Sequence, residues 1–215
     1  PTKQIWHCFG CSLGGDVFEF VKQIEGMEFP EALQILASRA GVTLKRPTVE
    51  YKKEAQEKNT LLAINDLAAK YYAKVLADSS SAEQARLYLQ KRGFQPSSIA
   101  KWQIGFSPED FHAFENFISK KGFQKREAVA AGLLVEKDDG SFFDRFRGRV
   151  MFPLFDIHGR VVGFTARILE GGPSTGSGQP SAAKYVNSPE TLIYSKSHLL
   201  YGLHLAKSEI RKLGE

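Results

Sequence analysis

The sequence predicts an α+β fold in which short amphipathic helices precede a stretch rich in β-hairpins. Apolar residues recur at helical spacing through most of residues 17–131. Two apolar runs, at residues 150–155 and 161–167, flank residues 156–160, whose Asp and Gly are typical of a hairpin turn. The chain has 215 residues, of which 42% are hydrophobic and 25% charged, so it can build one or two cores.

A small unit around a Cys-x-x-Cys motif is expected at the N-terminus. Residues 5–9 resemble a short strand that enters a tight turn at Gly10. Asp16 suits the N-cap of a helix that ends near Gly26, and a second helix at residues 31–40 has Pro30 in its first turn. Residues 45–59 are charged and poor in apolar side chains. We interpret them as a linker and domain boundary, with the start of a long polar helix as the alternative.

The rest of the chain is predicted to be helical first and β-rich later. A Gly/Ser/Pro-rich loop at residues 171–183 separates the strands from a last helix. We expect helices at residues 60–77, 82–92 (capped by Ser81), 96–101, 109–120, 124–131 and 196–212, an extended segment at 102–106 and strands within 142–169.

The net charge of +5 is concentrated in the last third of the chain. Residues 141–215 hold ten Lys and Arg against six Asp and Glu, and ten minus six is +4. This excess favours either a basic face for phosphates or a solvated surface. No apolar run approaches the roughly 18 residues that span a bilayer, and residues 1–4 open no signal peptide. We therefore expect a cytoplasmic protein without a membrane partner.

Both cysteines lie in one motif, Cys8-Phe9-Gly10-Cys11, so a disulfide framework is excluded. Three interpretations remain open. The pair could be half of a zinc knuckle whose other two ligands precede Pro1, a redox pair, or two core thiols. The early position and the glycines of the turn favour zinc. A redox pair should lie at a helix N-terminus, and Gly14-Gly15 follow instead.

Four segments resemble the DnaG-type bacterial DNA primases, in family order. WHCFGCSLGGDVFEFVKQIEGMEFPEALQILASRAGV (residues 6–42) is similar to the second half of the family's zinc ribbon. The other three are similar to the N-terminal subdomain of its RNA-polymerase domain: YLQKRGFQPSSIAKWQIGFSP (residues 88–108), AGLLVEKDDGSFFDRFRGRVMFPLFDIHGRVVGFTARIL (residues 131–169) and KYVNSPETLIYSKSHLLYGLHLAK (residues 184–207).

The resemblance implies synthesis of short RNA primers from NTPs on a single-stranded DNA template. It implies the C-terminal half of a zinc ribbon at residues 1–44, a linker at 45–59 and the polymerase subdomain at 60–215, with 170–183 as a surface insertion. Cys8 and Cys11 become the second pair of Zn²⁺ ligands. The acidic residues that hold Mg²⁺ belong to a TOPRIM fold after Glu215, so no catalytic residue is expected here. A replicative helicase would bind another, C-terminal domain. The alternative is a non-catalytic zinc-ribbon module that binds single-stranded DNA.

Arg145 and Arg147 alternate with Phe146. On a strand both guanidiniums would share one face, and two adjacent forks suit phosphates. The alternative is a solvated face paired to Asp144 and Asp156. The resemblance favours the first interpretation, because these positions match the family's basic ridge.

The remaining candidates are spread over the chain, and we expect the cations of the last third, with Arg92, to line a single concave wall. Lys184, Tyr185 and Asn187 combine a cation, a ring and an amide, although a turn with a core tyrosine is the alternative. Lys196 opposes the dipole of the last helix, which suggests a role other than helix stability. The resemblance implies a template contact for Arg92, although a cation near a Gly cap is favourable for the helix anyway. Arg167, at the end of the second hairpin strand, is a weaker candidate. Lys3, Lys22 and Trp6 could reach DNA from the zinc unit, but we expect Trp6 to pack under the ribbon, and His158 to be a turn residue.

Overall fold

The computed structural model describes residues 4–10, 12–25, 27, 29–44, 49–169 and 183–213. The chain divides into two compact units, Pro1–Lys52 and Lys53–Glu215. Helices and antiparallel strands are mixed in both units, which confirms the predicted α+β class. Within the described residues, no helix combines the length and the apolar character that crossing a membrane requires.

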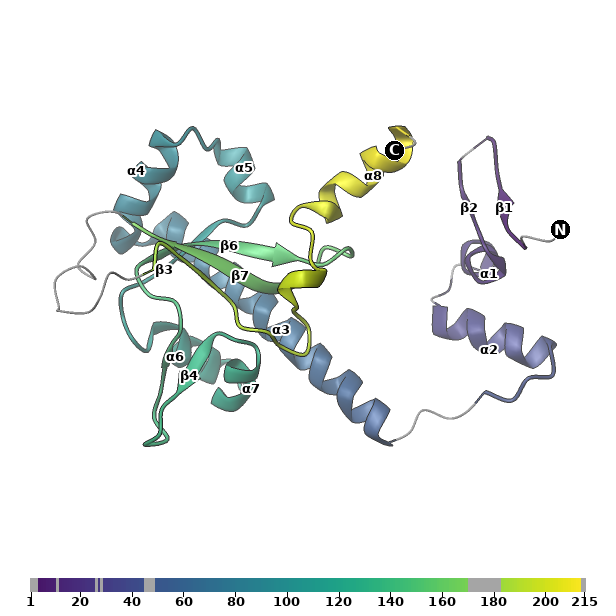
Figure 1. Ribbon diagram of the computed structural model, residues 1–215, viewed down its shortest axis with the longest axis horizontal. Helices are drawn as coiled ribbons and strands as arrows, with labels where there is room; N and C mark the ends of the chain where they lie inside the picture. The colour runs from purple at the N-terminus through teal and green to yellow at the C-terminus, as the bar shows by residue number, and fades with distance from the viewer. Residues whose placement is uncertain are drawn as a thin grey trace. The chain divides into compact units, whose positions relative to one another are not determined.

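The first unit is a β-hairpin followed by two helices (Figure 1). Strands β1 (Trp6–His7) and β2 (Gly14–Gly15) pair antiparallel, and α1 (Val17–Glu25) and α2 (Phe29–Arg39) follow. A Cβ atom on Gly14 would lie 2.8 Å from the Trp6 carbonyl oxygen, so the hairpin requires glycine there. The predicted N-cap is confirmed, because Asp16 Oδ1 accepts the Glu19 N–H at 2.9 Å.

Trp6 packs inside its own unit, as expected. Its ring meets Phe20 edge-on with centroids 5.4 Å apart, and its Nε1 donates to the Asp16 carbonyl at 3.1 Å. Lys22 forms an ion pair with Glu19 at 3.0 Å. The candidates Lys3 and Cys11 lie outside the described residues.

The second unit begins with a long helix, α3 (Val49–Asp78). Residues 49–59, interpreted as linker, are therefore the start of this helix, and the division between the two units falls within them, between Lys52 and Lys53. A 3₁₀ turn, η1 (Ser80–Ala82), leads into α4 (Glu83–Lys91), and α5 (Pro96–Lys101) follows. The cap of this region is Ser79 rather than Ser81, because Ser79 Oγ accepts the Ser81 N–H.

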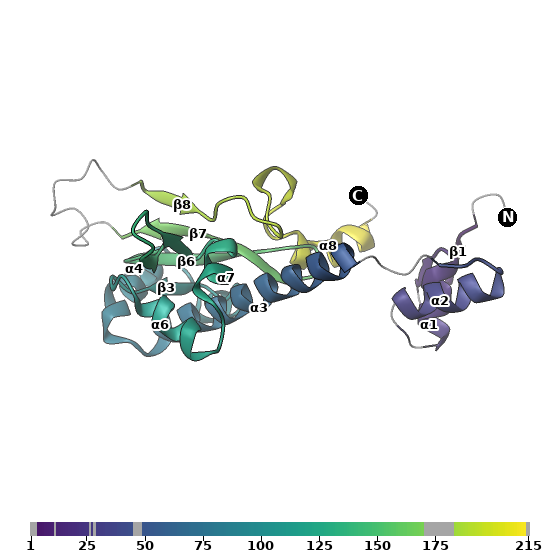
Figure 2. The same cartoon turned by 90° about the horizontal axis from the view of Figure 1, so that it is seen from below.

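A four-stranded antiparallel sheet lies at the centre of the second unit (Figures 1 and 2). The predicted 156–160 turn is present: the Asp156 carboxylate accepts the N–H groups of His158 and Arg160, so His158 is a turn residue as expected. The predicted extended segment at 102–106 is extended only from Gly105 on, because Trp102 and Gln103 still belong to the end of α5. The strand order is β3 (Gly105–Ser107), β6 (Arg149–Phe155), β7 (Val161–Ile168) and β8 (Tyr185–Asn187).

A smaller sheet and four helical segments complete the second unit. The predicted helix at residues 196–212 is wrong at its start. Only a 3₁₀ turn forms there, because Leu199 is extended and Gly202 has a φ of +80°, and α8 begins at Leu203. Of the predicted loop at residues 171–183, residues 171–182 lie outside the described residues. The segments are α6 (Ala113–Lys120), α7 (Lys125–Ala130), β4 (Leu134–Glu136) paired with β5 (Phe142–Asp144), η3 (Lys196–His198) and α8 (Leu203–Leu213).

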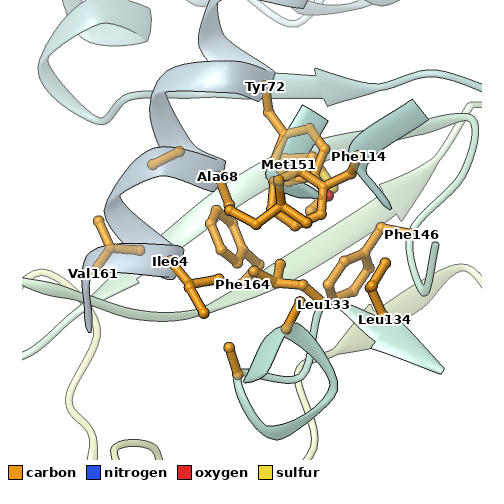
Figure 3. Close-up of a cluster of buried hydrophobic side chains, with 14 of the residues drawn as sticks. Ile64, Ala68, Tyr72, Phe114, Leu133, Leu134, Phe146, Met151, Val161 and Phe164 are labelled. Carbon is orange, nitrogen blue, oxygen red and sulfur yellow. The ribbon is translucent and has the colours of Figure 1, made fainter. Parts of the chain in front are cut away.

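The main core lies between α3 and one face of the large sheet (Figure 3). Ile64, Ala68 and Tyr72 recur every four residues and face the sheet, where Phe164 contributes a ring 5.7 Å from Tyr72. A Cβ atom on Gly105 would lie 2.5 Å from the Tyr72 backbone, so strand β3 approaches α3 this closely only with glycine. A second cluster on the opposite face joins the strands to α4 and α5, through Val150, Phe106 and Leu89 among others.

The core predicts a large loss of stability for Phe164→Ala, since Phe164 is fully buried. Truncation of a buried Phe costs about 3–5 kcal/mol through lost burial and the residual cavity. We expect that loss in the free energy of unfolding measured with urea. Leu87→Ala is the control, because Leu87 is 51% exposed on α4 and should change stability by less than about 0.5 kcal/mol. Similar losses in the two variants would contradict the packing described.

Candidate nucleic-acid interface

Three of the predicted residues, Arg92, Arg167 and Tyr185, meet at one end of the large sheet. Pairing aligns Val150 with Arg167 and Arg167 with Tyr185, so the last two share a face. The Arg167 guanidinium carbon lies over the rings of Tyr88, at 4.8 Å from the centroid, and Tyr185, at 5.6 Å. A pocket of about 440 Å³, here called the aromatic pocket, is lined by Tyr88, Arg92, Phe94, Trp102, Ile104, Phe152, Thr165, Arg167, Tyr185 and Tyr201.

Arg145 and Arg147 do not lie on a strand, so the argument from strand alternation was wrong. Strand β5 ends at Asp144 and β6 begins at Arg149, so residues 145–148 form the connection between them. We call residues 145–149, which include Arg149, the arginine loop. Phe146 is nevertheless fully buried. Arg147 packs over Phe111, with its guanidinium carbon 4.4 Å from the centroid, and over Phe143, at 5.3 Å. Guanidiniums are thus presented on an aromatic support.

Burial disfavours the charged form of the arginines in the arginine loop. It lowers the pKa of Arg145, Arg147 and Arg149, and the nearby Arg147 lowers the pKa of Arg149 further. The Arg145 Nε is buried without a hydrogen-bond partner among the described residues. Arg149, which the sequence interpretation overlooked, donates from Nη1 to the Ala183 carbonyl at 2.9 Å. That bond fixes the loop beside the residue before Lys184. Arg147 lies close enough to Arg149 to lower its pKa, so the loop favours an anionic ligand.

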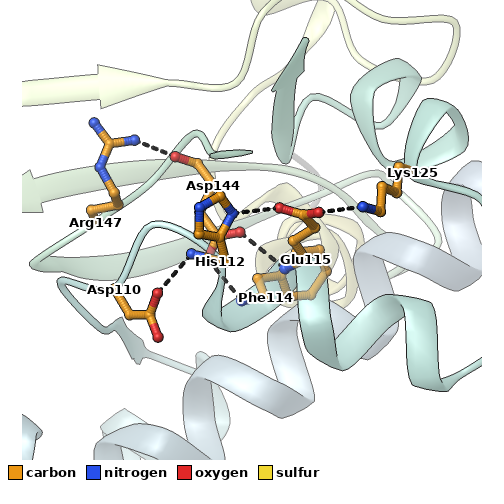
Figure 4. Close-up of polar contacts among 7 residues, drawn as sticks. All are labelled: Asp110, His112, Phe114, Glu115, Lys125, Asp144 and Arg147. Carbon is orange, nitrogen blue, oxygen red and sulfur yellow. Dashed lines mark hydrogen bonds and ion pairs between the residues drawn. The ribbon is translucent and has the colours of Figure 1, made fainter. Parts of the chain in front are cut away.

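Asp144 anchors the arginine loop to helix α6 (Figure 4). Its carboxylate is buried and accepts the Phe114 N–H at 2.7 Å and the Glu115 N–H at 2.9 Å, while Arg147 donates to its backbone carbonyl. The pairing of the arginines with Asp144 and Asp156, considered as an alternative, is therefore wrong, because the Asp144 carboxylate caps a helix and Asp156 pairs with Arg160 at 2.7 Å. No sequence pattern indicated this cap, since Asp144 lies 29 residues from Glu115.

Glu115 connects the cap to Lys125 and His112 (Figure 4). Its carboxylate pairs with Lys125 at 2.6 Å and with the His112 Nδ1 at 2.7 Å. Burial by itself raises the pKa of Glu115, but the hydrogen bonds from Lys125 and His112 outweigh it and the pKa is lowered. The network keeps the N-terminus of α6, and with it Phe111, in place beneath Arg147.

The structure divides the predicted residues rather than gathering them on one wall. Tyr185, Arg167 and Asn187 lie on the face of α4 and α5, because Asn187 pairs with Thr165 two positions along. Arg149 lies on the opposite face, next to Met151. Lys184 is exposed immediately before β8 and its carbonyl accepts the Ile168 N–H at 3.1 Å. The arginine loop and the residues on the face of α4 and α5 come together at the end of the sheet, where Arg149 donates to the carbonyl of Ala183, two residues before Tyr185.

Lys196 belongs to neither group. It begins the 3₁₀ turn η3, and its backbone N–H donates to Glu190 Oε1 at 3.0 Å. Since α8 starts only at Leu203, the argument from the helix dipole does not apply to Lys196.

The turn around Cys8 has the form expected of a metal knuckle. The Cys8 N–H donates to the Leu13 carbonyl at 2.7 Å, and the Cys8 carbonyl accepts the Ser12 N–H at 2.8 Å. These bonds bring Ser12 and Leu13 back to Cys8 in a tight turn, which is the setting that a Cys-x-x-Cys zinc ligand pair requires. Within the part of the chain that the structure describes, which excludes Cys11, no three His, Cys, Asp or Glu side chains are grouped to hold a metal.

Comparison with protein families gives two matches that together cover most of the chain. Residues 71–207 match the DNA primase catalytic core, N-terminal domain, and residues 1–53 match the CHC2 zinc finger. The DNA primase of Halalkalibacterium halodurans is 41% identical over 216 aligned positions, which cover 100% of this chain and 35% of that protein. The DNA primase of Streptomyces coelicolor is 40% identical, with 99% and 32% covered. The chain thus spans about a third of the length of these relatives.

Solved structures of bacterial primases are also similar to this chain. The RNA polymerase domain of Mycobacterium tuberculosis primase DnaG is similar with a TM-score of 0.63 and 40% identity, covering 71% of this chain and 47% of that one. A DnaG primase catalytic domain bound to ssDNA has a TM-score of 0.61 and 37% identity, covering 72% and 47%. The zinc-binding and RNA polymerase domains of Aquifex aeolicus primase cover 100% of this chain and 48% of that one, with a TM-score of 0.63 and 28% identity.

The Asp144 cap predicts an unusual dependence of stability on pH. Burial raises the pKa of this carboxyl from 3.8 to about 6. The folded protein then holds the proton more tightly than the unfolded chain, so the contribution to stability is full below about pH 3.8 and is lost as the pH rises through about 6. Relative to Asp144→Asn, the free energy of unfolding should fall by on the order of 2–3 kcal/mol from about pH 4 to pH 7.

The measurement is urea unfolding of both proteins at several pH values, together with an NMR titration of the Asp144 carboxyl carbon. A titration midpoint near 4, or parallel pH profiles for the two proteins, would show that burial does not raise the pKa of Asp144 in the folded protein.

Proposed function

The chain belongs to the DnaG-type bacterial DNA primases, and from that premise we propose that the full protein synthesises short RNA primers from NTPs on single-stranded DNA. The residues of this chain hold the template. One observation carries the proposal. The arginine loop and the group of Arg92, Arg167, Tyr185 and Asn187 come together at one end of the sheet, where Arg149 donates to the Ala183 carbonyl. The similarity to a primase catalytic domain bound to ssDNA supports the same assignment.

The two groups take different parts of the strand. Arg145, Arg147 and Lys184 neutralise phosphates, because guanidinium forks suit phosphate oxygens and the neighbouring cations raise the local positive potential. On the other face, Arg92 and Arg167 take further phosphates, while Tyr185 and Asn187 approach the sugars and bases. A strand that passes around the end of the sheet contacts both groups. Lys196 lies apart, and we assign it to a more distant part of the strand or to an incoming nucleotide.

The transfer of nucleotides requires groups that we place elsewhere in the protein. Mg²⁺ would be held by acidic residues of a TOPRIM fold, and we assign no catalytic role to the described residues. A replicative helicase would bind a further domain.

Zinc is assigned to the first unit, with Cys8 and Cys11 as two of its four ligands. The tight turn at Cys8 fits such a knuckle. The described part of the unit buries only Val21, Ala32 and Ala37, so a bound ion would contribute much of its stability. The alternative is a non-catalytic module that only binds single-stranded DNA. Nothing in the described residues favours it over the primase assignment.

The basic junction predicts salt-dependent binding of single-stranded DNA. Arg147→Ala and Lys184→Ala should each weaken binding of a labelled oligonucleotide roughly tenfold at low salt. Each should also lower the slope of log affinity against log salt concentration by about 0.7, since one phosphate contact is lost. Fluorescence anisotropy at several salt concentrations measures both quantities.

Lys70→Ala is the matched control. Lys70 carries the same charge on α3 but is paired with Asp66 at 2.7 Å. If the variants at residues 147 and 184 bound DNA like the control, the proposed template contacts would be refuted.

A further inference from the structure

We propose that a pocket between α3, α4 and α5 binds a small amphipathic anion, which is a molecule with an apolar body and one acidic group. The proposal goes beyond the proposed function and does not depend on it. The pocket, here called the three-helix pocket, has a volume of about 710 Å³. Its lining includes Ala77, Arg86, Phe94, Ile99, Ala100 and Gln103.

The three-helix pocket is distinct from the template surface proposed above. Among their described lining residues, it shares only Phe94 and Ile104 with the aromatic pocket. Arg167, Tyr185 and the residues of the arginine loop do not line it. The contacts assigned to the DNA strand therefore leave this pocket without a role.

The pocket is largely apolar, and its walls remain open to water. Leu76 and Ile104 are buried in the second core cluster and form the floor. Above them Ile99 is half-buried, and Pro96 and Ala100 are exposed. A volume of about 710 Å³ is far above the voids of packed interiors and lies within the roughly 300–1,000 Å³ typical of small-ligand sites. The apolar body of a ligand would extend the cluster and remove these walls from water.

Arg86 gives the pocket its preference for an anion. It is the one charged residue among the described residues of the lining. Its Nη1 donates to the carbonyls of Leu76 and Ser79, both at 2.8 Å, which fixes the side chain at the C-terminal end of α3. Arginine has five N–H donors, so those on Nη2 and Nε lie outside these two bonds. A guanidinium that is already held in place loses little freedom on binding an acidic group, and its geometry suits one.

A strained residue adds an amide to the rim of the pocket. Gln103 has a φ of +50°, in the left-handed region that favours glycine. It follows Trp102, the C-cap of α5, at the position where helices commonly place glycine. Glycine would relieve the strain but would remove the side chain that lines the pocket. The amide can donate to an acidic head group, so the strained side chain favours a ligand contact.

The test compares two fluorescent probes that share one apolar body. Anilinonaphthalene sulfonate carries an acidic group, and phenylnaphthylamine is the same body without it. Both become bright in apolar surroundings, so titration of the chain gives two affinities and their ratio. The titrations are made with and without a saturating oligothymidylate, which covers the cations of the proposed template surface.

Arg86→Gln should lower the ratio of the sulfonate affinity to the neutral affinity about tenfold, because charge-assisted hydrogen bonds are lost. The neutral probe should bind as before, which would also show that the pocket is still folded. Arg126→Gln is the matched control. Arg126 carries the same charge on α7, where it pairs with Glu136 at 3.5 Å, and its loss should leave the ratio unchanged. An unchanged ratio in Arg86→Gln would refute the anion site.

Ala100→Phe tests the pocket without altering Arg86. Ala100 is exposed on the wall, so a larger side chain fills the pocket without entering the core. Both probes should bind about tenfold more weakly or worse. Ala130→Phe is the control, because Ala130 is exposed at the end of α7 and outside the lining, and it should bind both probes normally.

Two results would overturn the proposal even if Arg86→Gln failed to fold. One is equal affinity of Ala100→Phe and Ala130→Phe for the probes. The other is displacement of the sulfonate probe by the oligothymidylate, which would place the probe on the template surface instead. Failure of the oligothymidylate itself to bind would contradict the proposed function alone, since the probes need no DNA.

Discussion

The antiparallel register of β6, β7 and β8 is the constraint on which the interface depends. It aligns Val150, Arg167 and Tyr185 on one face and Met151, Ala166 and Val186 on the other. Side chains alternate along a strand, so a slip of one residue would move Arg167 into the core and expose Ala166. The packing of Met151 and Ala166 against the α3 cluster opposes that slip. The core therefore determines which way the cation and the ring of the candidate site point.

A second constraint places the arginine loop where the sheet ends. The buried Asp144 carboxylate holds the N-terminus of α6, and Arg147 rests on Phe111 from the turn before that helix. Burial raises the pKa of Asp144, so the ionised cap costs stability, yet it attaches the cation-rich loop to α6. Arg149 then connects this loop to the residue before Lys184. In the proposed function, two faces of one sheet therefore contribute to a single path for the DNA strand.

Most helices and both long strands could be predicted from the sequence, because periodicity and turn residues are local signals. Asp16, Pro30 and the 156–160 turn appear as expected. The start of α8 was missed. For residues 49–59 the helix was only the alternative to the preferred linker, since a polar composition does not distinguish a linker from an exposed helix. The candidate residues were identified by type, but their grouping was not. It depends on pairing between distant strands and on the Asp144 cap, and neither leaves a pattern in one sequence. Arg149 shares the spacing of Arg145 and Arg147 and could have been included.

The most direct test of this account is whether one strand contacts both groups at once. The measurement is the salt dependence of single-stranded DNA binding by Arg147→Ala, Arg167→Gln and the double variant. If a single strand rounds the end of the sheet, the slope of the double variant falls by the sum of the two single reductions, about 1.4 in total for two phosphate contacts. A double variant with a slope no lower than that of either single variant would contradict the account.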